Sequence, residues 1–160
     1  MTGPAVWVFF YGSYMNRNVL READLAPDRL EPARLPGFDI RVEPRANLVR
    51  SEEHSVYGVL GRATHEELGR LYAHARDVLG ETYLPEAVLV EAAGRWQPAL
   101  CYVCHDMEPR PPDPEYVERI LAAAREHAFP AWYLDRVRRA GGGGRAAGTF
   151  ESSHKPLGKG

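Results

Sequence analysis

The spacing of apolar and polar residues along the chain predicts a mixture of strands and helices. A continuous apolar run at 6–10 is typical of a strand buried on both faces, and clean alternation at 38–42 is typical of a half-buried strand. The polar residues 50–54 separate two extended runs and therefore predict a β-hairpin turn. The proline-rich segment 27–37 is expected to be broken, edge-like structure. The predicted strands are residues 6–10, 38–42, 46–49, 55–60, 83–91 and 96–103.

Helices are predicted from the 3.6-residue apolar period together with capping residues. Thr64 and Glu67 form a capping-box pattern, and Gly80 is placed to end the same helix after Leu79. The other predicted helices follow Asn16, start at Pro114 and occupy residues 132–139. Strands come first, helices are mixed in, and there is no βαβαβ rhythm. We therefore expect an α+β fold with a mixed, largely antiparallel sheet curled into a small barrel with flanking helices.

Length, charge and cysteine content narrow the class of protein. The 160 residues suggest one domain, at 1–140, followed by a flexible glycine-rich tail at 141–160. A net charge of -2, with acids and bases interspersed, gives no reason to expect nucleic acid or a membrane as partner. No apolar run approaches about 18 residues, and the N-terminus does not read as a signal peptide. The lone C-x-x-C of Cys101 and Cys104 lies in a β-like run, which favours ordinary thiols over a metal site. Thiols of this kind are typical of a cytoplasmic protein, which we therefore expect.

The first strand ends in Tyr11-Gly12-Ser13-Tyr14, a stretch of turn formers and hydrogen-bond donors. A buried strand that ends in a Gly-Ser turn delivers free backbone N–H groups to one place. If such groups converge, they bind an anion or a developing oxyanion. Spacing alone favours the simpler interpretation, a tight turn into a helix.

An ordered set of segments resembles the gamma-glutamylcyclotransferase-like (AIG2-like) family over about residues 5–139. The segments are Tyr11 to Asn16, Pro44 to Val49, Ser55 to Leu60 and Pro114 to Leu134. The resemblance implies a mixed β-barrel with flanking helices and a central cavity. It also implies an acyltransferase-type enzyme that converts a small γ-glutamyl amide or peptide to 5-oxoproline and a released amine, with no metal and no cofactor. The implied substrate-binding residues are Tyr11, Gly12, Ser13 and Tyr14, and Tyr83 could point its hydroxyl into the cavity.

The general acid/base carboxylate of this family is where the sequence departs from the pattern. The matching position is Ala75, followed by Arg76 in place of the usual glycine. The helix is expected to run about one turn further than in the family, which makes Glu81 the first catalytic candidate and Asp77 the second. His74 is expected to pair with Asp77 on the helix surface.

Two alternatives to the cyclotransferase reaction stay open. The chain could be a non-catalytic module that binds a small ligand on the same fold, because Ala75 lacks the carboxylate. It could also be a related amide hydrolase that uses water. Arg41, Arg45 and Arg50 are candidates to bind a substrate carboxylate. The apolar last helix around Trp132 could serve a homodimer.

Overall fold

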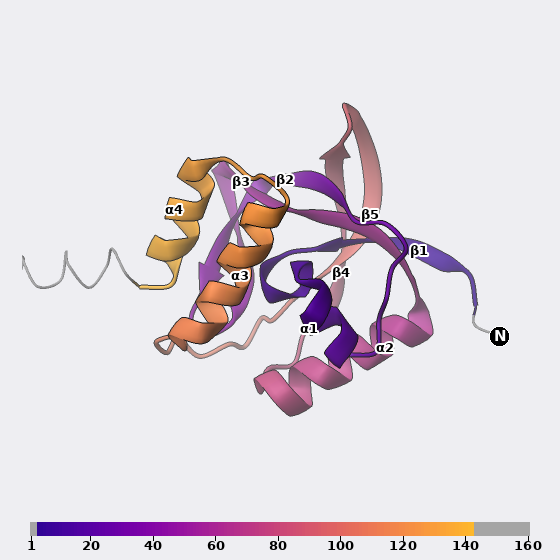
Figure 1. The fold of residues 1–160 in the computed structure, drawn as a ribbon, viewed down its shortest axis with the longest axis horizontal. Coiled ribbons are helices and arrows are strands. Elements are labelled where there is room, and N and C mark those ends of the chain that lie inside the picture. Colours follow the sequence, from indigo (N-terminus) through magenta and orange to yellow (C-terminus); the bar gives the residue numbers. More distant parts are fainter. Residues whose placement is uncertain (1–2, 143–160) are drawn as a thin grey trace, which may run out of the picture.

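Five strands close into a barrel in the order β1-β3-β2-β4-β5 in the computed structural model, which describes residues 3–142 (Figure 1). The strands are β1 (Ala5–Phe10), β2 (Glu31–Val42), β3 (Ala46–Thr64), β4 (Leu84–Ala92) and β5 (Arg95–Val103). Neighbouring strands are antiparallel, except that β1 meets β5 in parallel at Val8 and Leu100. The predicted α+β fold with a mixed, largely antiparallel barrel is confirmed.

Short helical turns and helices surround one side and one end of this barrel. They are η1 (Gly12–Met15), α1 (Arg17–Glu22), α2 (His65–His74), η2 (Ala75–Leu79), α3 (Pro114–Glu126) and α4 (Ala131–Ala140). In Figure 1, α1 lies between α2 and α3, and ion pairs join it to both helices. Among the described residues, no helix is long and apolar enough to cross a membrane.

The predicted hairpin turn at 50–54 is wrong, because β3 continues through these residues as one strand. β3 forms the hairpin with β2, and the chain reverses at 43–45 instead. The strand β2 also includes Glu31–Pro36, which pairs with Ser55–Leu60, so most of the proline-rich segment is not broken structure. Pro36 pairs with Ser55 and Phe38 with Arg50, so residues 51–54 form an irregularity in β3 opposite Gly37. Polar side chains on the outer face of a barrel do not end a strand.

The helical segment formed by α2 and η2 begins and ends where its sequence predicts. The Thr64 hydroxyl accepts the N–H of Glu67 at 3.1 Å, and the Glu67 carboxylate accepts the N–H of Thr64 at 2.8 Å, which completes the capping box. Beyond His74 the chain widens into the π-helical turn η2, and Gly80 ends it in the left-handed region at φ +81°. The extension of this helix to Leu79 is thereby confirmed.

Two predictions about the C-terminal part stay predictions. Trp132 on α4 is exposed and packs edge-on against Tyr57, while the homodimer itself stays a prediction. The expected tail at 141–160 lies outside the described residues from position 143 onward.

Candidate active site

The turn η1 lies directly on the first residue of β3. Gly12 has φ +67°, a left-handed backbone conformation that is strained for residues with a side chain. A Cβ built on Gly12 would lie 2.4 Å from the Cβ of Ala46. No side chain larger than hydrogen fits there without movement. Glycine at this position therefore allows the backbone of η1 to approach β3 closely.

Tyr11 is held in the core by Tyr102. The Tyr102 hydroxyl accepts the N–H of Tyr11 at 2.8 Å and donates to the carbonyl of Tyr11 at 2.9 Å. The Tyr11 hydroxyl donates to the carbonyl of Tyr102 at 2.6 Å, and the two rings stack with centroids 4.6 Å apart. Both hydrogen-bond donors of Tyr11 are thus occupied, so this residue shapes the site rather than offering a free donor to a ligand.

Ser13 offers free donors instead. Its side chain is buried at 2% exposure, and its hydroxyl makes no hydrogen bond to any described residue. The N–H groups of Gly12 and Ser13 open the turn, ahead of its first internal hydrogen bond, so the turn itself gives them no acceptor. Buried polar groups without partners are rare and indicate a site for a ligand or water. The turn therefore has a hydroxyl and two amides available.

The backbone of Ala46 joins two phenols beside this turn. The Tyr83 hydroxyl donates to the Ala46 carbonyl at 2.6 Å, and the Ala46 N–H donates to the Tyr116 hydroxyl at 2.8 Å. The hydroxyl proton of Tyr83 is therefore engaged by Ala46, and a role of Tyr83 in substrate binding stays a prediction. Tyr116 accepts from Ala46 and still has its own proton to donate, so it is a functional candidate that sequence reasoning missed.

The surroundings of Tyr116 keep its hydroxyl protonated. Burial raises the pKa of the Tyr116 phenol, and the Glu81 carboxylate raises it further. The Ala46 N–H and the Arg45 guanidinium act in the opposite direction. Tyr116 thus stays protonated and keeps its hydroxyl proton for donation.

Glu81 is a buried carboxylate, with 10% of its side chain exposed. Its N–H donates to the carbonyl of Ala75 at 3.1 Å, which folds the chain back against η2. The Cys104 thiol donates to Oε1 at 3.7 Å, and the exposed Arg110 guanidinium lies 3.6 Å from Oε2. Burial, with a smaller contribution from Glu81, raises the pKa of Cys104, so this thiol is a proton donor rather than a nucleophile.

Cys104 is itself held in place by an amide side chain. The Asn47 side-chain NH₂ donates to the carbonyl of Cys104 at 2.7 Å, and its oxygen accepts the N–H of Cys104 at 3.0 Å. The start of β3 is thereby tied to the end of β5 beside Glu81. The prediction of ordinary, unbridged thiols agrees with the structure, in which both cysteines are free and buried.

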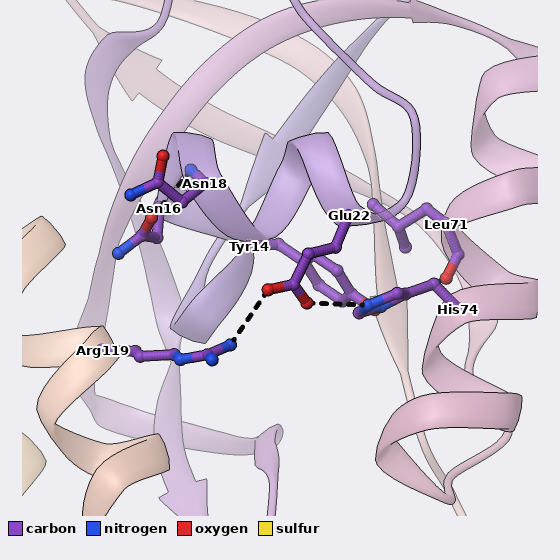
Figure 2. Close-up of polar contacts among 7 residues, drawn as sticks. All are labelled: Tyr14, Asn16, Asn18, Glu22, Leu71, His74 and Arg119. Atoms are coloured by element: carbon purple, nitrogen blue, oxygen red, sulfur yellow. Dashed lines mark hydrogen bonds and ion pairs between the residues drawn. The ribbon is translucent and has the colours of Figure 1, made fainter.

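Asp77 lies in a different environment, although it is only four residues from Glu81. Its side chain is 65% exposed and pairs with its neighbour Arg76 at 3.1 Å. The expected surface pair of His74 and Asp77 is wrong: His74 is buried, 2.9 Å from the Tyr14 hydroxyl and 3.3 Å from the Glu22 carboxylate (Figure 2). The reason is that η1 and α1 cover the face of the helix on which His74 lies.

The three arginines predicted as candidates for binding a substrate carboxylate have partners within the protein or lie in exposed positions. Arg45 donates to the carbonyl of Leu79 at 3.1 Å and lies 4.8 Å from the ring centre of Tyr116. Arg50 pairs with Glu86 at 3.3 Å, and Arg41 is exposed. Within residues 3–142, no group of three or more histidine, cysteine or acidic residues could hold a metal ion.

The family model described as "Gamma-glutamyl cyclotransferase, AIG2-like" matches residues 8–121. The chain therefore belongs to this family, in agreement with the resemblance of its sequence segments. No curated protein matches the chain in a sequence search.

Solved structures share the fold. An uncharacterized protein from Homo sapiens is 21% identical, with a TM-score of 0.74 over 85% of this chain and 88% of that chain. A structure described as gamma-glutamyl cyclotransferase is 22% identical, with a TM-score of 0.71 over 84% of this chain and 87% of that one. YkqA from Bacillus subtilis is 25% identical, with a TM-score of 0.72 over 88% of this chain and 55% of that chain.

Proposed function

We propose that the protein is a γ-glutamyl cyclotransferase, which converts a γ-glutamyl amide or peptide to 5-oxoproline and a released amine. The observation that carries this proposal is that the buried carboxylate of Glu81 and the turn of Ser13 both lie against the start of β3. Cys104 contacts Glu81 and is hydrogen-bonded to Asn47, and Gly12 lies against Ala46, next to the unpaired hydroxyl of Ser13. A proton acceptor and oxyanion donors are what intramolecular aminolysis requires.

The reaction begins with a proton transfer. Glu81 takes a proton from the α-ammonium group of the γ-glutamyl substrate, and the free amine attacks the carbon of its own γ-carbonyl. The new C–N bond closes a five-membered ring, and the carbonyl electron pair moves to oxygen. The N–H groups of Gly12 and Ser13, with the Ser13 hydroxyl, are the proposed donors to this oxyanion.

Collapse of the tetrahedral intermediate releases the amine. Glu81 returns its proton to the leaving nitrogen, and the bond between this nitrogen and the carbon of the former γ-carbonyl breaks as the carbonyl re-forms. The ring nitrogen passes its extra proton to Glu81, from which it reaches the amine or solvent. The products are neutral lactam and a protonated amine, and the balance requires neither a metal nor a cofactor.

Arg110 is the proposed partner of the substrate α-carboxylate. Its guanidinium lies beside Glu81 while its side chain is 64% exposed, so it compensates the buried carboxylate and can move. The substrate α-ammonium takes over as the positive partner of Glu81. Arg110 is then free to pair with the substrate α-carboxylate.

The test is product analysis with a panel of γ-glutamyl amides whose leaving amine is an α-amino acid, a lysine ε-amine or an alkylamine. We expect 5-oxoproline to form with at least one of them. Glu81→Gln should lower turnover by about 10²- to 10⁴-fold with the fold intact. Asp77→Asn is the matched control, since Asp77 is exposed and already paired with Arg76, and it should retain turnover.

Each alternative function has its own signature in the same assay. Free glutamate in place of 5-oxoproline would identify an amide hydrolase. Binding of γ-glutamyl amides without any product would identify a non-catalytic module, the alternative that Ala75 suggests. If Asp77→Asn abolished turnover and Glu81→Gln did not, the assignment of the base would be wrong while the reaction class survived.

A further inference from the structure

His74 is a buried, titratable side chain that the proposed reaction does not use. Figure 2 shows it between Tyr14 and Glu22, with Arg119 on the far side of Glu22. Nδ1 of His74 lies 2.9 Å from the Tyr14 hydroxyl, and Nε2 lies 3.3 Å from Oε1 of Glu22. Oε2 of Glu22 pairs with Arg119 at 3.6 Å. The chain of contacts joins η1, α2, α1 and α3.

The partners define which ring nitrogen donates. A carboxylate only accepts, so the Nε2 that faces Glu22 carries a hydrogen. In the neutral ring, Nδ1 then accepts the hydroxyl proton of Tyr14. Burial raises the pKa of the Tyr14 phenol, so its hydroxyl keeps the proton that it donates.

The two sides of His74 lead to the two halves of the proposed site. Tyr14 directly follows Ser13, which carries the unpaired hydroxyl. Ala75 directly follows His74, and its carbonyl accepts the N–H of Glu81 at 3.1 Å. The hydrogen bond between Tyr14 and His74 is therefore a short bridge between the oxyanion donors and the carboxylate.

Helix α3 belongs to the same arrangement. Arg119, which pairs with Glu22, lies one turn after Tyr116 on this helix. Glu22 thus contacts both His74 and Arg119. Through Arg119 it is joined to the turn of α3 on which the Tyr116 hydroxyl accepts the N–H of Ala46. One network is connected to Ser13, Glu81 and Tyr116.

We propose that His74 is a positioning residue, which holds the Ser13 turn at the correct distance from Glu81 through its hydrogen bond to Tyr14. This role rests on the proposed cyclotransferase function. It assigns His74 no proton transfer to or from the substrate. Misplacement of reacting groups by about 1 Å costs on the order of 100-fold in rate, so a bridge of this kind acts mainly on kcat.

The structure also predicts that the fold tolerates loss of the bridge. The Tyr14 hydroxyl lies 3.5 Å from the carbonyl of Leu71, which offers a second acceptor one turn before His74. Because this second acceptor is present, the Tyr14 hydroxyl stays buried and hydrogen-bonded when the imidazole is replaced. Its position relative to Glu81 is then no longer set by His74.

Two substitutions at one position separate the two contacts of the ring. In His74→Asn, the side-chain oxygen takes the place of Nδ1 and still accepts from Tyr14, while the contact with Glu22 is lost. In His74→Gln, the amide nitrogen takes the place of Nε2 and still donates to Glu22, while the contact with Tyr14 is lost. Tyr14→Phe removes the same bridge from the other side. His65→Gln, at an exposed histidine on the same helix, is the control.

The first measurement is steady-state kinetics with the γ-glutamyl amide that the wild-type protein cyclises. We expect kcat to fall about 10- to 100-fold in His74→Gln and Tyr14→Phe, with KM little changed. His74→Asn should stay within about threefold of the wild type, and His65→Gln should match it. Equal losses in His74→Asn and His74→Gln would overturn the proposal, because the Tyr14 contact would then not matter.

The second measurement is amide hydrogen exchange of residues 12–15, which needs no activity. Exchange should become faster in His74→Gln and Tyr14→Phe and remain unchanged in His74→Asn and His65→Gln. Unchanged exchange in His74→Gln would overturn the positioning role even if kcat fell. If the wild-type protein turned over no γ-glutamyl amide, the proposed function would fail, and the exchange data would still decide whether His74 holds the turn.

Discussion

Two regions of the barrel differ in what they offer a ligand. The Ala46 cluster, formed by Gly12, Ser13, Ala46, Glu81 and Tyr116, has closely packed backbones and buried polar groups. The Trp7 groove, on the outside of β1 and β3, is a hollow of about 510 Å³. Its lining residues are Ala5, Trp7, Ala26, Pro27, Asp28, Arg29, Glu31, Leu60, Arg62 and Glu67.

The difference lies in how the polar groups are used. In the Trp7 groove, Glu67 is occupied by the capping box of α2, and Arg62 donates to the carbonyl of Ala5 at 2.8 Å. In the Ala46 cluster, Ser13 has a buried hydroxyl without a partner among the described residues, and Glu81 is removed from water. The Trp7 groove is the larger hollow, and the Ala46 cluster holds the buried polar groups. Unsatisfied buried groups, rather than volume, point to the site.

The largest expected effect concerns the tyrosines of the barrel core and of α2 at high pH. Burial raises the pKa of Tyr11, Tyr83 and Tyr102 well above 10, and that of Tyr72 to about 12. The unfolded chain releases these protons at about pH 10, earlier than the folded chain. The stabilisation is therefore complete below pH 10 and is lost as the pH rises above it, by up to about 1.4 kcal/mol per pH unit for each phenol.

Urea denaturation between pH 9 and 12, followed together with tyrosinate absorbance, measures this loss. Tyrosinate should form in step with unfolding. Buried phenols that ionised near pH 10 in a chain that is still folded would contradict the prediction. The Trp7 groove contributes no tyrosine to this transition.

Gly12→Ala breaks the cluster by crowding it. The new Cβ meets Ala46 in a left-handed backbone conformation, so we expect a loss of about 2–5 kcal/mol in the free energy of unfolding and loss of turnover. Gly37→Ala is the control: Gly37 has φ +89°, but a Cβ added there would meet no atom within 4 Å. It should cost about 1–2 kcal/mol from backbone strain alone. Equal losses for both variants in urea denaturation would show that close approach to Ala46 does not matter.

Tyr116→Phe leaves the buried N–H of Ala46 without its acceptor. We expect a loss of about 1–3 kcal/mol in the free energy of unfolding, together with slower turnover. Tyr133→Phe provides the comparison, because the buried Tyr133 hydroxyl makes no hydrogen bond to the described part of the chain. Thermal or urea denaturation should show that this second substitution is neutral or stabilising. A larger loss at Tyr133 than at Tyr116 would contradict the argument.

The smallest effect is expected in the Trp7 groove. The Arg62 guanidinium lies 4.9 Å from the ring centre of Trp7 in an exposed position. Arg62→Ala should lower the free energy of unfolding by about 0.5–1 kcal/mol and leave kcat and KM unchanged. A large loss of turnover in this variant would move the search for the substrate site to the groove.

Local signals in the sequence predicted much of the fold. The capping box at Thr64, the stop at Gly80 and the helix start at Pro114 all depend on neighbouring residues, and the structure contains each of them. The continuity of β3 and the first half of β2 were missed. Each depends on pairing with the other across the barrel, which overrides the local preference of polar residues and prolines for turns.

The candidate site divides in the same way. Glu81 could be singled out because Gly80 marks the end of a helix, and its catalytic role stays a prediction. Tyr116 and Cys104 could not be found by local reasoning, because Tyr116 reaches Ala46, and Cys104 reaches Glu81, only when the fold has closed. His74 was misjudged because helical spacing says which face a residue occupies, but not which other segments cover that face.

The parallel contact of β1 with β5 has a consequence for the kinetics of folding. The strand that leads into η1 lies between β3 and the last strand of the barrel, so Tyr11 gains its partner Tyr102 only after contacts spanning 91 residues have formed. Such long-range closure is slow compared with helix formation. During synthesis, α2 can form early, whereas the turn at Gly12 acquires its final surroundings last. We therefore expect catalytic competence to appear in the final phase of folding, together with barrel closure.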